Sequence, residues 1–193
     1  MITKFLLVAG HPALDLVNTL DWRFRNDGAE ELLKSYQDLL RFTEQSKLLT
    51  SAQTRRLRGS DRALEGSKQL REALAEIFYA RLDGGRPSAA AQRTLERYSK
   101  AARLRQKLNW KQSPLEWEWP AAEHDPALPL WALAQSASDL MTSDAIDRVR
   151  ACGNPECRWL FLDTSKNHTR RWCDMKLCGN RMKARRFKAQ RRA

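Results

Sequence analysis

Four cysteines in two equal pairs constrain the fold of this chain more than any other feature. The pairs consist of Cys152, Cys157, Cys173 and Cys178. Four residues lie inside each pair and fifteen lie between the pairs. Two tight turns that each supply two thiolates can hold one tetrahedral metal ion, provided that the chain between them folds back. Gly153 and Gly179 fit this interpretation, because glycine tolerates the left-handed backbone angles that such turns often need.

We expect the bound ion to be Zn²⁺, held by all four cysteines. Two disulfides or four unrelated buried thiols are the alternatives, but paired cysteines in a chain without marks of secretion are more typical of metal ligands. The evenly split pairs suit a zinc-bound hairpin and helix, although they leave an iron–sulfur cluster open. His168 lies between the pairs, yet four cysteines already complete a tetrahedron.

The basic residues are concentrated around the cysteines. Residues 150–193 contain thirteen Lys and Arg against three acidic residues, so they carry +10 of the chain's net charge of +12. The remaining 149 residues carry only +2. A polyanionic partner for this segment is the simplest explanation. A solvated basic tail is the alternative for the last half-dozen residues.

The order of elements in the cysteine-rich segment resembles a treble clef. Residues 159–162 predict a strand, and we expect residues 169–172 to return as its partner. The second cysteine pair then opens a helix from Met175 to about Gln190. Trp172 and Phe187 are expected in the core of this finger.

The predicted helix carries a cationic stripe. At about 100° per residue, Arg181, Arg185 and Lys188 fall within a window of roughly 60° that continues to residue 192. Such a stripe can follow a phosphate backbone or lie in a major groove. The predicted nucleic-acid contacts are Arg170, Arg171, Arg181, Lys183, Arg185, Arg186 and Lys188.

The rest of the chain predicts a helical bundle. Apolar residues recur with a period near 3.6 in residues 35–46 and 67–82, and we also expect helices at 51–58, 88–103, from Pro126 or Pro129 to Leu140, and briefly at 143–150. A short strand is predicted at 5–9, before a helix that begins at Pro12. Period-two alternation on both sides of residues 112–114 predicts a hairpin, and we expect its tryptophans to cover the bundle.

Two groups of motifs resemble known families. The C-x4-C pair, Arg170-Arg171-Trp172-Cys173 and Cys178-Gly179-Asn180-Arg181 are similar to the CGNR zinc finger. Gly10 with Leu14-Asp15-Leu16-Val17-Asn18-Thr19 is similar to the start of the ABATE domain. The resemblance implies a bacterial transcription regulator with an ABATE-like domain at 1–149, which senses a signal, and a DNA-binding zinc finger at 150–193.

We therefore expect a mainly α protein with a small β component: a helical N-terminal domain with a short antiparallel hairpin, followed by a treble-clef-like finger. Duplex DNA is the expected partner. We expect a cytoplasmic protein with no membrane association and no enzymatic activity. A small-molecule effector and a homodimer are left open. No flexible linker precedes Cys152, so the finger should be held in a fixed orientation.

Three alternatives remain. The first is an RNA- or ribosome-associated zinc module. The second is a thiol-based redox switch, which would use the cysteines chemically. The third is an enzyme with its site around His11 and Asp15, which more simply form a helix cap and a turn contact. That enzyme would need a deep polar pocket with convergent titratable groups.

Overall fold

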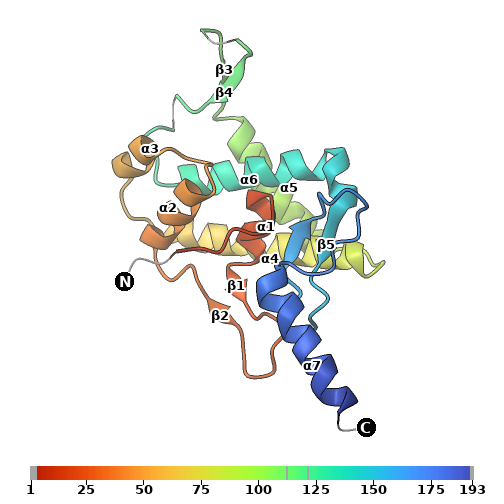
Figure 1. Ribbon diagram of the computed structural model, residues 1–193. Helices are drawn as coiled ribbons and strands as arrows, with labels where there is room; N and C mark the ends of the chain where they lie inside the picture. The colour runs from red at the N-terminus through yellow and green to blue at the C-terminus, as the bar shows by residue number, and fades with distance from the viewer. Residues whose placement is uncertain (1–3, 112, 121, 192–193) are drawn as a thin grey trace.

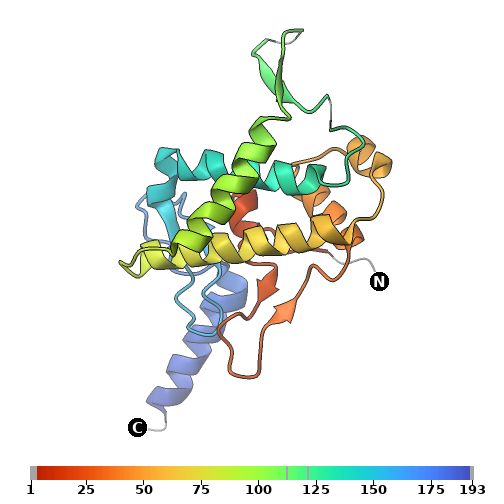
Figure 2. The ribbon, with the colours of Figure 1, turned by 180° about the vertical axis from the view of Figure 1, so that it is seen from behind.

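The computed structural model describes residues 4–111, 113–120 and 122–191. Three helices form the centre of the body, and α5 crosses both α4 and α6 (Figures 1 and 2). A short helix, α1, packs against α4 and α6, while α2 contacts α3, α4 and α6. The bounds of these helices are α1 Pro12–Val17, α2 Tyr36–Gln45, α3 Ser51–Arg56, α4 Asp61–Leu82, α5 Ala89–Arg103 and α6 Leu128–Met141.

Capping residues explain where these helices begin. Ser35 and Asp38 form a reciprocal capping box at α2, and Thr50 and Gln53 form another at α3. The predicted start of the long helix at residue 67 was six residues late. The side chain of Ser60 caps α4 by accepting a hydrogen bond from the amide of Ala63, which fixes the earlier start.

Close approach of α4 and α6 requires a glycine. A Cβ atom at Gly66 would lie 2.8 Å from Cδ2 of Leu130 and 3.2 Å from the hydroxyl of Tyr98. A side chain at this position would therefore displace the side chains of Leu130 and Tyr98, which pack here between the helices. The helix α6 is buried along nearly its whole length, which accounts for its strongly apolar sequence.

Three two-stranded antiparallel pairs complete the fold of the described residues. They are β1 (Leu20–Asp21) with β2 (Glu30–Glu31), β3 (Lys107–Asn109) with β4 (Glu116–Glu118), and β5 (Val149–Ala151) with β6 (Leu160–Leu162). The mainly α architecture with small β components confirms the predicted fold class. The first pair was not predicted, and residues 5–9 form no strand. The expected short helix at 143–150 is a 3-10 turn at Asp144–Arg148 that leads directly into β5.

The β3–β4 hairpin forms as predicted but does not cover the bundle. It projects from one end of the molecule, opposite the end from which the C-terminal helix extends (Figures 1 and 2). Trp110 is 78% exposed and Trp117 is 52% exposed, so the expectation that these rings are buried was wrong. Trp119 packs partly against the core. Strand alternation shows which side chains share a face, but not whether that face meets the bundle.

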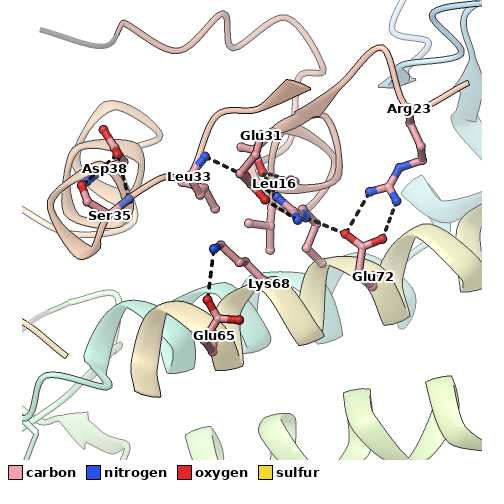
Figure 3. Close-up of polar contacts among 11 residues, drawn as sticks. Leu16, Arg23, Glu31, Leu33, Ser35, Asp38, Glu65, Lys68 and Glu72 are labelled. Carbon is pink, nitrogen blue, oxygen red and sulfur yellow. Dashed lines mark hydrogen bonds and ion pairs between the residues drawn. The ribbon is translucent and has the colours of Figure 1, made fainter. Parts of the chain in front are cut away.

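The β1–β2 pair forms an arm that is clamped to α4. Arg23 pairs with Glu72, as Figure 3 shows. Arg71 is buried and makes two hydrogen bonds to Glu31 at 2.7 and 2.8 Å. Because a buried guanidinium is costly without a partner, these pairs fix the arm on the body.

The body and the cysteine-rich segment share one apolar core. Leu14, Phe42 and Leu133 belong to the same buried cluster as Phe161 and the four cysteines. The expected domain boundary between residues 149 and 150 falls inside β5. Among the described residues, none of the helices is both long enough and apolar enough to span a bilayer.

Candidate metal centre and basic helix

The four cysteine sulfurs converge on one point. All four side chains are buried, and their Sγ atoms lie within 4.8 Å of one another. Sγ of Cys157 lies 3.8 Å from Sγ of Cys173. This is far longer than a disulfide bond, and all four thiols are free. Four sulfurs at about 2.3 Å from a tetrahedral zinc ion would be about 3.8 Å apart, so this donor set fits such an ion.

The first cysteine pair lies at the turn between β5 and β6. The amide of Cys152 donates to the carbonyl of Trp159 at 2.8 Å, and the amides of Cys157 and Arg158 donate to the carbonyl of Asn154. The predicted partner of the 159–162 strand was therefore wrong, because β6 pairs with β5 rather than with residues 169–172. Those later residues are held instead by one backbone bond, from Gly153 to the carbonyl of Arg171 at 2.9 Å.

Of the second pair, Cys178 lies in a π-helical turn, Met175–Gly179, that continues into α7 (Asn180–Gln190), and Cys173 lies two residues before that turn. This agrees with the predicted helix. The side chain of Asp174 caps the turn by accepting from the amide of Leu177 at 2.9 Å. The amides of Cys178 and Gly179 donate to the carbonyl of Asp174, so this one residue organises the start of the turn.

Gly153 and Gly179 are required for close packing rather than for left-handed backbone angles. Neither has a positive φ; within the finger, the positive values belong to Arg158 and His168. A Cβ atom at Gly153 would lie 3.2 Å from the ring of Trp172, and one at Gly179 would lie 2.3 Å from Sδ of Met175. The sequence thus marked the right glycines for the wrong reason.

Asn154 is a neighbour of the sulfurs that sequence reasoning missed. It is fully buried, and its Nδ2 donates toward Sγ of Cys178 at 3.7 Å. Such a bond stabilises a thiolate and orients it for metal binding. Hydrogen bonds from the Cys157 and Cys173 thiols also lower the pKa of Cys152, while the bonds to Cys152 and Cys173 raise the pKa of Cys157. The sequence signal that could have found Asn154 is its place between Cys152 and Cys157.

Arg170 has a structural position. Its guanidinium donates to the carbonyls of Trp172, Cys173 and Val8, and it stacks 4.3 Å from the ring of Phe161. These bonds tie the segment between the two cysteine pairs to the N-terminal residues of the chain. The N–H donors and the flat face of the Arg170 guanidinium are thus already engaged inside the protein.

The loop before Arg170 is organised by Asp163. One carboxylate oxygen of this fully buried residue accepts from the amide and the hydroxyl of Ser165, and the other accepts from the amide of Arg170 at 2.9 Å. The bonds from Ser165 hold the pKa of Asp163 below its usual value. Asp163 therefore remains a carboxylate that shapes the loop.

Side-chain contacts from α1 and α4 fix the finger to the body. The amide group of Asn18 accepts from the backbone N–H of Leu160 at 2.9 Å and donates to its carbonyl at 3.0 Å. Tyr79 of α4 donates to the carbonyl of Arg158 at 3.0 Å, and the Arg158 guanidinium pairs with Asp83 at 2.8 Å. The finger therefore has a defined orientation on the helices.

The cationic stripe of α7 is divided between two environments. Arg181 lies 4.8 Å over the ring of Trp22 on the β1–β2 arm, and Arg185 pairs with Glu156 at 3.0 Å. These contacts turn the start of the stripe toward the protein. Lys183 and Arg186, on the opposite side of the helix, are exposed.

The structure also shows the surroundings of the other predicted nucleic-acid contacts. Arg171, Lys183, Arg186 and Lys188 are exposed and form no ion pair within the described part of the chain. Phe187 is 59% exposed, so its expected place in the finger core was wrong. Trp172 does pack against the core, at its edge.

His11 and Asp15 have the structural roles that the sequence favoured. Nδ1 of His11 accepts from the amide of Ala13 at 3.3 Å and caps α1. Asp15 is buried and accepts from the amide of Ala9 at 3.0 Å. Burial raises the pKa of Asp15 to about 7. The space beside Asp15 is only ≈ 10 Å³, which does not admit a substrate.

Comparison with known families agrees with this architecture. The ABATE family model, described as a “putative stress-induced transcription regulator”, matches residues 10–144. The chain belongs to this family. The CGNR zinc finger model matches residues 148–191, which contain all four cysteines. The ABATE part thus ends just before β5, and the four-sulfur cluster is the metal-binding site of the CGNR finger. A search of curated proteins finds no match to the chain.

Proposed function

We propose that this protein is a transcription regulator that binds duplex DNA through its zinc finger, with the ABATE domain receiving the signal. Zn²⁺ would be held by Cys152, Cys157, Cys173 and Cys178 and would cross-link the two turns on which α7 is mounted. The protein's own side chains orient that helix and supply the positive charge that meets the phosphates.

The exposed cations on the outer side of α7 carry this proposal. Lys183 and Arg186 are exposed and lack carboxylate partners among the described residues, whereas Arg185 is engaged by Glu156. The finger contains three acidic residues. Glu156 pairs with Arg185, Asp163 accepts from the amide of Arg170, and Asp174 accepts from the amide of Leu177. Positive charge on this side is therefore left for an external polyanion.

The proposed DNA surface consists of those predicted contacts that are exposed and form no ion pair among the described residues. It comprises Arg171, Lys183, Arg186 and Lys188. We leave out Arg170, because its guanidinium is committed to backbone carbonyls. Arg181 and Arg185 orient the helix through Trp22 and Glu156 and contribute to the field around it.

Fluorescence anisotropy with a labelled duplex, measured over a range of salt concentrations, tests the proposal. We expect the wild-type affinity to fall steeply with salt. Lys183→Gln/Arg186→Gln should weaken binding and make the slope of log K against log salt less negative by about 1.8, because each phosphate contact contributes about 0.9. The matched control is Arg93→Gln/Lys100→Gln, which removes two exposed charges from α5.

Equal losses in the two double variants, or binding that does not respond to salt, would contradict a specific α7 surface. Replacing the duplex by a structured RNA decides the first alternative, since an RNA module should prefer it. A redox switch would release its metal under mild oxidation, which a zinc-sensitive dye would detect.

A further inference from the structure

A cavity of ≈ 660 Å³ opens between the first half of α4, α5 and the start of α6. Its volume lies within the range of about 300–1,000 Å³ that is usual for ligand pockets. Figure 2 shows α5 passing in front of α4 and α6, and these three helices supply most of the lining residues. None of the residues that line it belongs to the finger.

Three arginines line this cavity: Arg62, Arg97 and Arg105. None of them forms an ion pair with a carboxylate of the described residues; the arginine of α5 that does so is Arg103, with Asp139. An arginine without a carboxylate partner, at the wall of an open cavity, offers its donors to an anion that enters.

The two acidic residues in the lining only partly offset these arginines. Glu65 pairs with Lys68 of its own helix at 3.0 Å, as Figure 3 shows. Asp125 keeps its charge and accepts from the amide of Ala127 at 2.8 Å, in the turn that leads into α6. Three arginines face two carboxylates, one of which is paired with a lysine, so the cavity keeps an excess of positive charge.

Aromatic rings hold two of the guanidinium groups in place. Cζ of Arg105 lies 4.0 Å from the ring centre of Trp131, and its Nη1 donates to the carbonyl of Ala101 at 2.8 Å. Cζ of Arg97 lies 4.6 Å from the ring centre of Tyr98. Stacking fixes the guanidinium planes but leaves most of their edge donors free, which favours bidentate recognition of an anion.

We propose that this cavity binds a small organic anion that joins an acidic group to an apolar body. The acidic group would meet Arg97 and Arg105, and the apolar body would lie against Leu130, Trp131 and the neighbouring Pro126. This assignment rests on the proposed signal-receiving role of the ABATE domain. It does not depend on whether the finger binds DNA.

A matched pair of fluorescent probes tests the assignment in the metal-loaded, full-length protein. 8-Anilinonaphthalene-1-sulfonate is an organic anion, and N-phenyl-1-naphthylamine has the same rings without the sulfonate. We expect the sulfonate to bind at one saturable site per chain. Arg97→Gln/Arg105→Gln should weaken that binding by roughly tenfold or more, because two charge-assisted contacts are lost, and should leave the neutral probe unaffected.

Arg93→Gln/Lys100→Gln is the control, because it removes the same amount of charge from α5 at residues that do not line this cavity. Equal weakening in the control, an unchanged affinity in Arg97→Gln/Arg105→Gln, or no saturable binding of the sulfonate would overturn the assignment. Thermal unfolding checks that each variant is folded, and the single, exposed Arg97→Gln replaces the double variant if that one is not. DNA affinity is measured separately without probe, so failure of one proposal leaves the other testable.

Discussion

At the scale of single residues, buried polar side chains in α1 and at its C-terminal end determine how the body meets the finger. Asn18 offers both its amide oxygen and its amide nitrogen to the backbone of Leu160, as a neighbouring strand would. Asp15 holds the amide of Ala9, and the carbonyl of Ala9 accepts from the amide of Leu162 at 2.8 Å. Buried backbone groups without partners are costly, so these contacts set the register of the junction.

The pKa of Asp15 predicts a pH dependence of stability. Its pKa is raised by burial from 3.8 to about 7, so the folded state binds a proton that the unfolded state has already lost in this window. The contribution of this proton to the free energy of unfolding is fully present below about pH 4 and is lost as the pH rises toward 7. Urea denaturation should show wild type losing up to about 1.4 kcal/mol per pH unit relative to Asp15→Asn within the window.

The comparison with Asp15→Asn cancels the pH dependence of metal binding, which both proteins share. The substitution keeps an oxygen that can accept from the amide of Ala9. Above pH 7 the difference between the two proteins should become constant. If the free energies of unfolding of the two proteins change in parallel over the whole pH range, Asp15 does not titrate in this way.

At the scale of elements, the sequence predicted what local signals determine. The helices follow from apolar periodicity together with caps such as Ser35 and Ser60. Pairing of β6 with β5 could not be predicted in the same way, because a short apolar strand such as Leu160–Leu162 accepts a neighbour from either side. The exposed Trp117 has the same cause, since alternation contains no information about what packs against a face.

The β1–β2 arm depends on its ion pair with α4. Glu31→Gln should lower the free energy of unfolding by about 2–3 kcal/mol, because the buried guanidinium of Arg71 would lose the charge of its bidentate partner. Chemical denaturation measures the loss. Glu30→Gln is the matched control, because the pair of Glu30 with Lys34 is exposed and should contribute little.

A loss of comparable size in Glu30→Gln would mean that net charge, rather than the buried pair, stabilises the arm. The arm also carries Trp22, which lies under Arg181. If the arm orients α7 in this way, Glu31→Gln should weaken DNA binding in proportion to the fraction of molecules in which the arm has detached from α4.

At the scale of the whole molecule, the body and the metal centre are one packing unit. The four cysteines lie in the same buried cluster as the helical core. The clustering of the four cysteines could be predicted from the sequence because their spacing is specific. The supporting residues Asn154 and Arg170 could not, because an asparagine or an arginine acquires its role only from distant partners such as Val8.

Removal of the metal should therefore destabilise more than the finger. We expect a strong chelator to lower the melting temperature of the helical signal by about ten degrees, since a few kcal/mol shift a chain of this size by that amount. Circular dichroism at 222 nm measures it. Added Zn²⁺ should restore the original transition. A helical transition that stays in place while the metal is lost would show that the finger unfolds on its own.

The bond between Asn18 and Leu160 also has a consequence for synthesis. These partners are 142 residues apart, so a chain growing from its N-terminus completes α1 long before β6 leaves the ribosome. During that interval the amide of Asn18 and the carbonyl of Ala9 have no backbone partner from β6. Contacts between such distant residues form late and slow folding. The strand β6 is thus made long after the segment that it completes, and a messenger truncated near residue 149 would yield a body in which Asn18 and Ala9 lack these partners.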